Sequence, residues 1–311
     1  MHRASLASLN KEPVALTIGN FDGFHRGHCL LVEQVQQTAK ALGVRSALLS
    51  FSPSPSHFFS KTSSKSVVMS WRDRLKWLQN KGIDRVHILH FDAQLAACRA
   101  ESFLDQVLCE RVQAHHIIVG DDFHFGYRRE GSPEWLVQHA PQRGVGVTCV
   151  PAQLDGGRRI SSSWIREALA KGDVETAIRL LGRPYQLRGR VRQGAQRGRT
   201  WGFPTLNLNP SQYPLIRGVF RVSVEIPGID YPVAGIANVG QRPTLEEHNP
   251  PVSIEIHLLE EGSWNLYGYK VNVSFLEKCR DEQKFESFEL LKQQIALDVQ
   301  WAKMRFAQES S

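Results

Sequence analysis

Near its N-terminal end the chain has an apolar strand, a glycine-rich turn and a helix, and this order constrains the fold most. Residues 14–18 are all apolar or small and predict a buried strand, while residues 30–42 repeat apolar side chains at helical spacing. Gly43 ends the predicted helix, and residues 44–51 predict a second apolar strand. The sequence therefore predicts a β-turn-α-β unit, which is a building block of parallel sheets.

The turn of this unit, Gly19–His28, favours phosphate binding. A helix N-terminus offers unpaired N–H groups and the positive end of a dipole. His25 and His28 stand three residues apart, so they share one helical face and can both donate to phosphate oxygens. A glycine-rich surface turn with two incidental histidines is the alternative, and the flanking strand and helix argue against it. Three glycines let a ligand approach the backbone: Gly19, Gly23 and Gly27.

Composition limits the compartment and the number of domains. The 311 residues are enough for two domains, and 41% hydrophobic and 22% charged residues are typical of globular proteins. No apolar run reaches the length of a membrane span, and the N-terminus lacks the apolar segment of a signal peptide. Five scattered cysteines without a CxxC pair indicate reduced thiols. We therefore expect a cytoplasmic protein that contacts no membrane.

The positive charge of the chain favours an anionic ligand. The net charge is +7, and residues 183–199 contain six arginines and no acidic residue. A nucleic-acid surface, a solvated basic loop and a loop for nucleotide phosphates are three interpretations of this stretch. The motif that begins at Gly194 favours the nucleotide, and the stretch largely lacks the aromatic residues of nucleic-acid surfaces. We expect no nucleic-acid partner.

The pattern of predicted elements changes near residue 183. Strand and helix signals alternate before it, which predicts a parallel sheet covered on both faces, with ligands at the carboxyl ends of the strands. Short strands with glycine and proline turns follow it and predict an all-β domain, closed by an amphipathic helix from about 285 to 307. We expect a first domain of residues 1–183 and a second of residues 184–311.

Two further segments are expected at the first site. Asp122 follows a strand together with Phe123 and Phe125, whose rings can stack on a planar ligand, although such rings usually pack in a core. Arg129 comes shortly after them. Residues 160–166 begin a helix with three serines and end in an arginine, which suits a phosphate, while a plain serine N-cap is the alternative.

A second site is predicted on two strands of the C-terminal half. Thr205 and Asn207 share one face of an extended strand, and their oxygens suit Mg²⁺. Glu255 and His257 project together from another strand, where a carboxylate can act as general base for a substrate hydroxyl. The alternative is that these polar residues merely face water. The chain contains no Walker A sequence, so a kinase here is not of the P-loop type.

The order and spacing of these motifs resemble the bacterial bifunctional riboflavin kinase/FMN adenylyltransferase (FAD synthetase) family. The motifs are GNFDGFHRGH, VGDDFHFG, ISSSWIR, GRTWGFPTLNL, GIANVGQRPT, and IEIHLLE followed by LYG. The resemblance implies an α/β Rossmann-like nucleotidyltransferase domain, followed by an all-β barrel riboflavin kinase domain with a C-terminal helix. It also implies that riboflavin is phosphorylated to FMN and FMN is adenylylated to FAD, with ATP as co-substrate and Mg²⁺ as cofactor.

For adenylyl transfer, the resemblance implies that His25 and His28 contact the ATP phosphates. Arg166 would steady the same nucleotide, and Asp122 with its aromatic neighbours would lie along the flavin. Other residues of these motifs that would bind nucleotide or flavin are Gly19, Asn20, Phe21, Asp22, Gly23, Phe123, Phe125, Arg129, Ser162 and Ser163.

For the kinase, the resemblance implies that Thr205 and Asn207 hold Mg-ATP. Glu255 would accept the proton of the ribityl hydroxyl as it attacks the γ-phosphate. Other residues of the kinase motifs that would bind the substrates are Gly198, Arg199, Gly202, Pro204, Asn238 and Arg242.

One loop departs from the family pattern. Family members commonly carry Phe-Glu-Pro-His-Pro after the second strand, and this chain has Phe-Ser-Pro-Ser-Pro at residues 51–55. Both prolines remain, while Ser52 and Ser54 replace an acid and a larger polar residue. The alternative function is therefore a riboflavin kinase with a weakened or inactive adenylyltransferase domain. We expect a monomer or a weak homo-oligomer.

Overall fold

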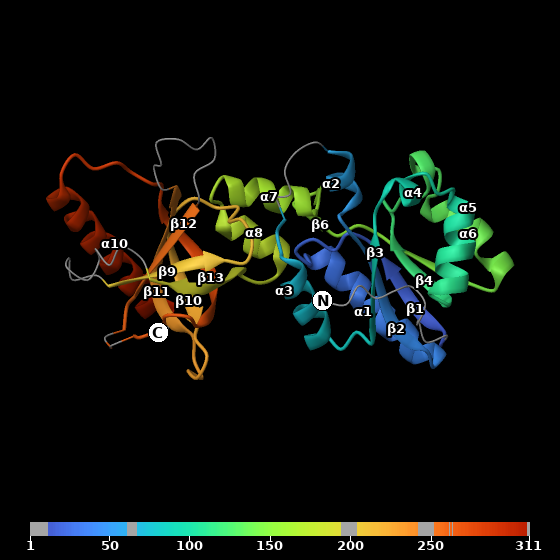
Figure 1. Cartoon of the computed structure of the whole chain (residues 1–311), viewed down its shortest axis with the longest axis horizontal. Helices are drawn as coiled ribbons and strands as arrows, with labels where there is room; N and C mark the ends of the chain where they lie inside the picture. Colours follow the sequence, from blue (N-terminus) through green and yellow to red (C-terminus); the bar gives the residue numbers. More distant parts are fainter. Residues whose placement is uncertain are drawn as a thin grey trace. The chain divides into compact units, whose positions relative to one another are not determined.

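The computed structural model describes residues 12–60, 67–193, 204–241, 252–260, 262 and 264–309. Contacts divide the chain into two compact units, of which the first comprises Met1–Ser64 and Trp71–Ser161 and the second Lys65–Ser70 and Ser162–Ser311 (Figure 1). The helices α7 (Ser162–Ala170) and α8 (Val174–Leu181) therefore group with the second unit. The expected domain boundary between residues 183 and 184 stays a prediction.

A five-stranded parallel sheet forms the centre of the first unit, in the order β3-β2-β1-β4-β5. Its strands are β1 (Val14–Ile18), β2 (Arg45–Ser52), β3 (Arg85–His90), β4 (Ala114–Gly120) and β5 (Gly146–Val150). All five residues of β1 are buried, because this strand lies between β2 and β4 and is covered on both faces. The strand order reverses beside β1, so a ligand crevice is expected where β1 ends.

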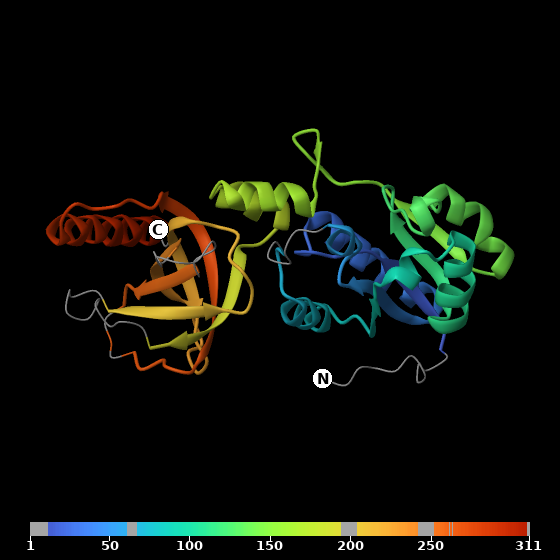
Figure 2. The same cartoon turned by 45° about the horizontal axis from the view of Figure 1, so that its top comes forward.

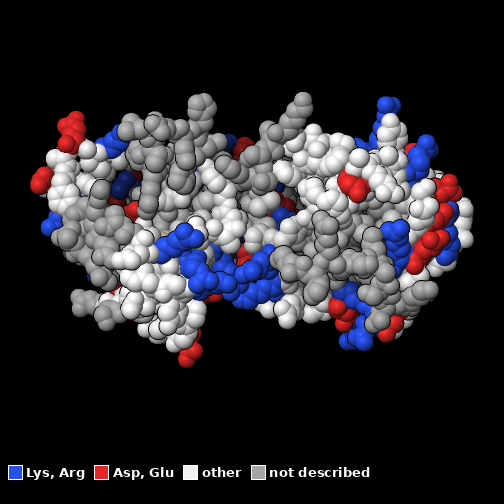
Figure 3. Space-filling view, in the orientation of Figure 1, with Lys and Arg blue, Asp and Glu red and all other residues white. Residues whose placement is uncertain are grey.

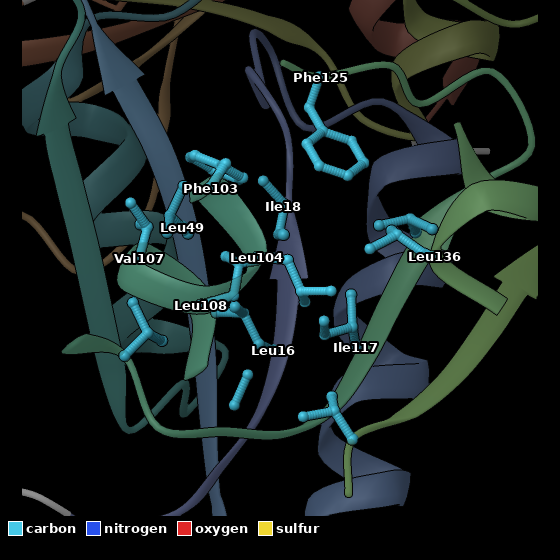
Figure 4. Close-up of a cluster of buried hydrophobic side chains, with 14 of the residues drawn as sticks. Leu16, Ile18, Leu49, Phe103, Leu104, Val107, Leu108, Ile117, Phe125 and Leu136 are labelled. Carbon is cyan, nitrogen blue, oxygen red and sulfur yellow. The ribbon is translucent and has the colours of Figure 1, made fainter. Parts of the chain in front are cut away.

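Helices cover both faces of this sheet, as predicted. One face packs against α1 (Arg26–Leu42), and the other carries the main apolar core (Figure 4). That core brings Leu16 and Ile18 of β1 against Leu104 and Leu108 of the π-helix η1 (Phe103–Arg111). The remaining elements are α2 (Pro55–Phe59), α3 (Trp71–Asn80), α4 (Ala93–Ala96), α5 (Ala100–Ser102), η2 (Tyr127–Arg129), α6 (Pro133–His139), η3 (Pro141–Arg143), β6 (Leu154–Asp155) and β7 (Arg158–Arg159).

A closed antiparallel barrel forms the second unit, in the order β10-β11-β12-β9-β8-β13. Its strands are β8 (Tyr185–Arg192), β9 (Thr205–Pro210), β10 (Gly218–Glu225), β11 (Val233–Gln241), β12 (Val252–Leu258) and β13 (Lys270–Arg280). Leu206 and Leu208 are buried in the barrel while Thr205 and Asn207 alternate with them, which is the predicted period of two. The all-β prediction is confirmed.

The last helix, α10 (Phe288–Glu309), packs along the barrel (Figure 2). Val299 and Ala302 of α10 join Val219 and Ile236 of the barrel in one apolar cluster. The Arg280 guanidinium pairs with the buried Asp298 carboxylate at 2.7 Å. In the part of the chain that the structure describes, no helix is long and apolar enough to cross a membrane.

Candidate functional sites

The turn after β1 is shaped by two buried phenylalanines. Phe21 and Phe24 have φ values of 47° and 44°, a left-handed conformation that costs energy for residues other than glycine. Their rings stack on each other, and Phe24 also stacks on Trp77 of α3 at 4.2 Å between ring centroids. Burial of these rings offsets the backbone strain and fixes the turn. Phe21, expected to bind a ligand, is therefore a packing residue of the site.

The structure brings the two predicted histidines into contact. Their rings stack with 3.7 Å between centroids, and His25 is only 6% exposed. His25 caps the N-terminus of α1, because its Nδ1 accepts a hydrogen bond from the backbone N–H of His28 at 3.3 Å. In a neutral imidazole the ring proton of His25 then lies on Nε2, which can donate to a ligand.

His28 is held in its neutral form. Burial lowers the pKa of His28 well below its usual range, and charge on the His25 ring, when it is protonated, and on Arg74 lowers it further. Its Nδ1 is buried and has no hydrogen-bond partner among the described residues. A buried nitrogen without a partner at a helix N-terminus is suited to a ligand, since an unsatisfied polar atom is costly.

An arginine from another helix supports this turn. The Arg74 guanidinium pairs with the Asp22 carboxylate at 2.6 Å, where both side chains are largely buried, and donates to the Asn20 carbonyl at 3.0 Å. Asp22 is thus held by the fold, although its motif position suggested ligand binding. Sequence analysis missed Arg74, because it lies 52 residues beyond Asp22 and belongs to none of the motifs.

The segment after β4 contains an ion triad. The Arg159 guanidinium pairs with Asp122 at 2.7 Å and with Asp121 at 2.6 Å. The Asp122 carboxylate therefore already has a partner, one that sequence analysis did not identify. Arg129 is exposed and has a left-handed backbone, with φ of 62°.

The two predicted stacking rings differ in environment. Phe125 is 8% exposed, lies in the apolar core and contacts Phe103 and Trp135 (Figure 4). Phe123 stacks on Phe125 with 5.5 Å between centroids and is only partly buried. Phe125 thus has the core role that aromatic rings usually take, and Phe123 is the ring of the two that is more accessible to a ligand.

A second group of aromatic rings follows β2 and β3. Phe58, Phe59 and Phe91 contact one another edge to face, and Phe59 is 68% exposed. Ser54, one of the two departures from the family pattern, caps α2 by accepting a hydrogen bond from the backbone N–H of His57. This serine thus has a structural role in a loop that carries exposed aromatic rings.

The serine-rich segment begins α7, as predicted. Ser162 and Ser163 are the first two residues of α7, and the Arg166 guanidinium donates to the Ser163 hydroxyl at 3.2 Å. By its contacts, α7 belongs to the second unit.

The barrel brings together the residues predicted for the second site. Glu255 on β12 lies directly opposite Asn207 on β9 and opposite Asn238 on β11. His257 lies opposite Thr205. Side chains of opposite residues project from the same face about 5 Å apart, so these polar groups form two adjacent rows on the outer face of the barrel.

The histidine of the second row, His257, has a defined protonation state. The His257 ring donates from Nδ1 to the carbonyl of Pro204 at 3.0 Å. Burial lowers the pKa of His257, so the ring is neutral at neutral pH. Pro204 contributes a backbone carbonyl to this contact. Gly198, Arg199, Gly202 and Arg242 lie outside the described residues.

Two oxygen donors, one from each row, fit Mg²⁺ held together with substrate phosphates. Within the described ranges, no group of three or more His, Cys, Asp and Glu residues could hold a metal ion. Thr205 and Asn207, the predicted ligands, instead offer a hydroxyl and an amide carbonyl, which are hard oxygen ligands. Mg²⁺ commonly takes few protein ligands and completes its shell with phosphates and water.

The predicted basic stretch lies partly on β8. Its inward residues, such as Leu187 and Val191, are buried, while Arg188, Arg190 and Arg192 face outward. Figure 3 shows lysine and arginine side chains gathered over the barrel. Arginines at every second position of a strand lie on one face of it.

Comparisons with known proteins match each unit to one half of a single family. A family model described as FAD synthetase matches residues 7–164, and one described as riboflavin kinase matches residues 181–306. A solved structure described as a macrolide-efflux protein from Streptococcus pneumoniae has a TM-score of 0.83 at 29% identity and covers 94% of both chains.

Curated relatives match along nearly the whole chain. Proteins named bifunctional riboflavin kinase/FMN adenylyltransferase are 39% identical in Haemophilus influenzae, covering 94% of both sequences, and 36% identical in Escherichia coli, covering 94% of this chain and 93% of the relative. The Bacillus subtilis relative is 32% identical and covers 97% of this chain and 95% of its own length. The resemblance predicted from the motifs is confirmed, and the chain belongs to the bifunctional riboflavin kinase/FMN adenylyltransferase family.

Proposed function

We propose that this protein phosphorylates riboflavin to FMN in the barrel unit and then adenylylates FMN to FAD in the α/β unit. The observation that best supports this proposal is that each unit has its own group of candidate catalytic residues. His25 and His28 lie at a helix N-terminus in the α/β unit, and Asn207 and Glu255 lie in one row on the barrel. Each constellation lies in the part of the chain that matches the corresponding family model.

In adenylyl transfer, an FMN phosphate oxygen attacks the α-phosphorus of ATP, and the bond to the departing pyrophosphate breaks. The Nε2–H of His25, the ring of His28 and the N-terminus of α1 donate to phosphate oxygens and stabilise the charge that develops there. Because His28 is neutral, it acts as a hydrogen-bond partner and not as a fixed cation. The expected contacts of Arg166, Ser162 and Ser163 with this nucleotide stay predictions.

In the kinase reaction, the ribityl hydroxyl attacks the γ-phosphorus of ATP and ADP departs. Glu255 accepts the hydroxyl proton, and Thr205 and Asn207 would hold Mg²⁺ with the phosphates of ATP. Mg²⁺, when bound, neutralises phosphate charge and aligns the transferring group.

Several observations support a flavin site in the first unit. The partly buried Phe123 and the exposed Phe59 offer ring faces of the kind on which an isoalloxazine can stack. Asp122 lies beside Phe123 and is oriented by Arg159.

All five cysteines lie in the described part of the chain and none forms a disulfide, which supports a cytoplasmic location. A monomer or weak homo-oligomer stays a prediction.

The bifunctional activity is favoured over a kinase alone. The first unit matches its family model, and the stacked histidine pair lies intact at the helix N-terminus. In the divergent loop, the side chain of Ser54 caps the N-terminus of α2.

The test is a single time course with purified protein, riboflavin, ATP and Mg²⁺, in which the flavins are separated by chromatography. We expect FMN to appear first and then to give way to FAD. Accumulation of FMN without FAD would favour the kinase alone, and unchanged riboflavin would refute both activities.

A further inference from the structure

A row of outward-facing polar residues crosses four neighbouring strands of the barrel. Glu255 on β12 lies opposite Asn238 on β11 and opposite Asn207 on β9, and Asn207 in turn lies opposite Arg192 on β8. The residues next to them, such as Leu208 and Val191, are buried in the barrel interior. Arg192 therefore projects from the same face as Asn207 and Glu255.

Arg192 occupies the end of this row. It is the last residue of β8, and the pairing of β8 with β13 ends two residues earlier, where Arg190 lies opposite Lys270. The Arg192 side chain is exposed, and among the described residues it has no hydrogen-bond or ion-pair partner. Arg190, by contrast, donates to the carbonyl of Gly268 at 2.8 Å. Arg192 is thus available for a ligand bound on this row.

The order of the row assigns Arg192 to one part of the nucleotide. In the proposed kinase reaction, Glu255 would lie at the hydroxyl that attacks, and Asn207, which lies opposite Glu255, would help to hold Mg²⁺ with the ATP phosphates. Arg192 lies beyond Asn207, two strand spacings or about 10 Å from Glu255, and its long side chain can reach back toward Asn207. If the attacking hydroxyl lies at Glu255, the departing diphosphate would lie on the Arg192 side of Asn207.

We propose that Arg192 binds the β-phosphate of ATP in the kinase reaction, where it stabilises the ADP that leaves. This inference rests on the proposed kinase function. As the bond from the ribityl oxygen to the γ-phosphorus forms, the bond between the γ-phosphorus and the β,γ-bridging oxygen breaks. That oxygen leaves on the β-phosphate of ADP, and Glu255 takes the hydroxyl proton. Negative charge increases on the β-phosphate during this step, and a planar guanidinium is suited to stabilise it with paired hydrogen bonds. Arg192 is the one cation among the four residues of the row.

The test compares Arg192→Gln with a matched control, Arg190→Gln, in which an arginine on the same face of the same strand is replaced. FMN formation is measured with varied ATP and riboflavin, and inhibition by ADP gives its Ki. For Arg192→Gln we expect kcat/KM for ATP to fall and the Ki of ADP to rise by about tenfold, the effect of one charge-assisted hydrogen bond. The KM for riboflavin should stay unchanged. Arg192→Lys should recover part of the loss, and Arg190→Gln should change none of these constants.

Three outcomes would overturn the inference. An unchanged Ki of ADP in Arg192→Gln would mean that the guanidinium does not bind the β-phosphate. Equal effects of Arg192→Gln and Arg190→Gln would indicate that the losses come from the overall charge of this strand face. A rise of the KM for riboflavin as large as that of the KM for ATP would indicate a structural role of Arg192. Failure of the unmodified protein to form FMN would refute the proposed function itself and is recognised before any variant is compared.

Discussion

His28 is the residue on which adenylyl transfer should depend most. We expect His28→Ala to lower the rate of FAD formation from FMN by about a hundredfold or more, because a preorganised hydrogen-bonding group at the transferring phosphate is lost. FMN formation from riboflavin should stay unchanged, since it uses the barrel. Both rates are measured by chromatography on the same sample. His115→Ala, which removes an exposed histidine of the same unit, is the control, and loss of both activities in a folded variant would contradict the two-site assignment.

The low pKa of His28 also predicts a pH dependence of stability. Burial and the neighbouring His25 and Arg74 side chains keep His28 neutral in the folded protein, whereas in the unfolded chain it takes up a proton below about pH 6.5. The stabilisation is therefore complete above this value, and the free energy of unfolding falls as the pH drops from there toward the folded pKa. A titration of the histidine ring protons by NMR, assigned with His28→Gln, should show no protonation of His28 near pH 6.5. A midpoint near 6.5 would disprove this account.

Among the ion pairs that link α10 to the barrel, the Arg280–Asp298 pair should contribute to the stability of the fold. Asp298 is 5% exposed and accepts hydrogen bonds from both Arg280 and Gln294. Asp298→Asn removes the charge and leaves the Arg280 guanidinium without its partner, which should cost roughly 3 kcal/mol of unfolding free energy. Thermal or urea unfolding measures this loss. Glu289→Gln, at an exposed position of the same helix, should change stability by less than about 0.5 kcal/mol, and equal effects of the two variants would argue against a special role of this pair.

The elements differ in how far the sequence could predict their roles. Alternation along a strand is local, so the shared face of Thr205 and Asn207 followed from their spacing alone. The register that places Asn207 opposite Glu255 is set by the closure of the barrel, which no local pattern encodes. The position of Phe125 after β4 suggested that its ring could stack on a ligand, yet the ring lies in the core. It packs there because it contacts Phe103 of η1 and Trp135 of α6.

Contacts that join distant segments were the hardest to predict. Arg74 reaches the turn after β1 from α3, and Arg159 reaches Asp122 from β7. Neither arginine lies in a motif, and an arginine on a helix or in a hairpin is ordinarily a surface residue. Their roles become visible only when the sheet brings these segments to the carboxyl ends of β1 and β4.

At the scale of the whole molecule, the two reactions should be separable and should complement each other between molecules. Glu255→Gln removes the general base of the barrel site, so this variant should form no FMN from riboflavin but should still convert supplied FMN to FAD. His28→Ala should have the opposite defect. FMN is a small product that can leave one molecule and bind another, so a mixture of the two variants should convert riboflavin to FAD.

The time course of this mixture distinguishes diffusion from direct transfer. If FMN diffuses freely, it should accumulate to a level that falls as more of the Glu255→Gln variant is added. When labelled riboflavin is the substrate, added unlabelled FMN should dilute the label that enters FAD. The unmodified protein, tested with the same unlabelled FMN, should show the same dilution. Suppose that the FAD formed by the unmodified protein keeps undiluted label while the FAD formed by the mixture carries diluted label. This result would contradict free diffusion, because FMN would then have to pass between the two sites of one chain without leaving it.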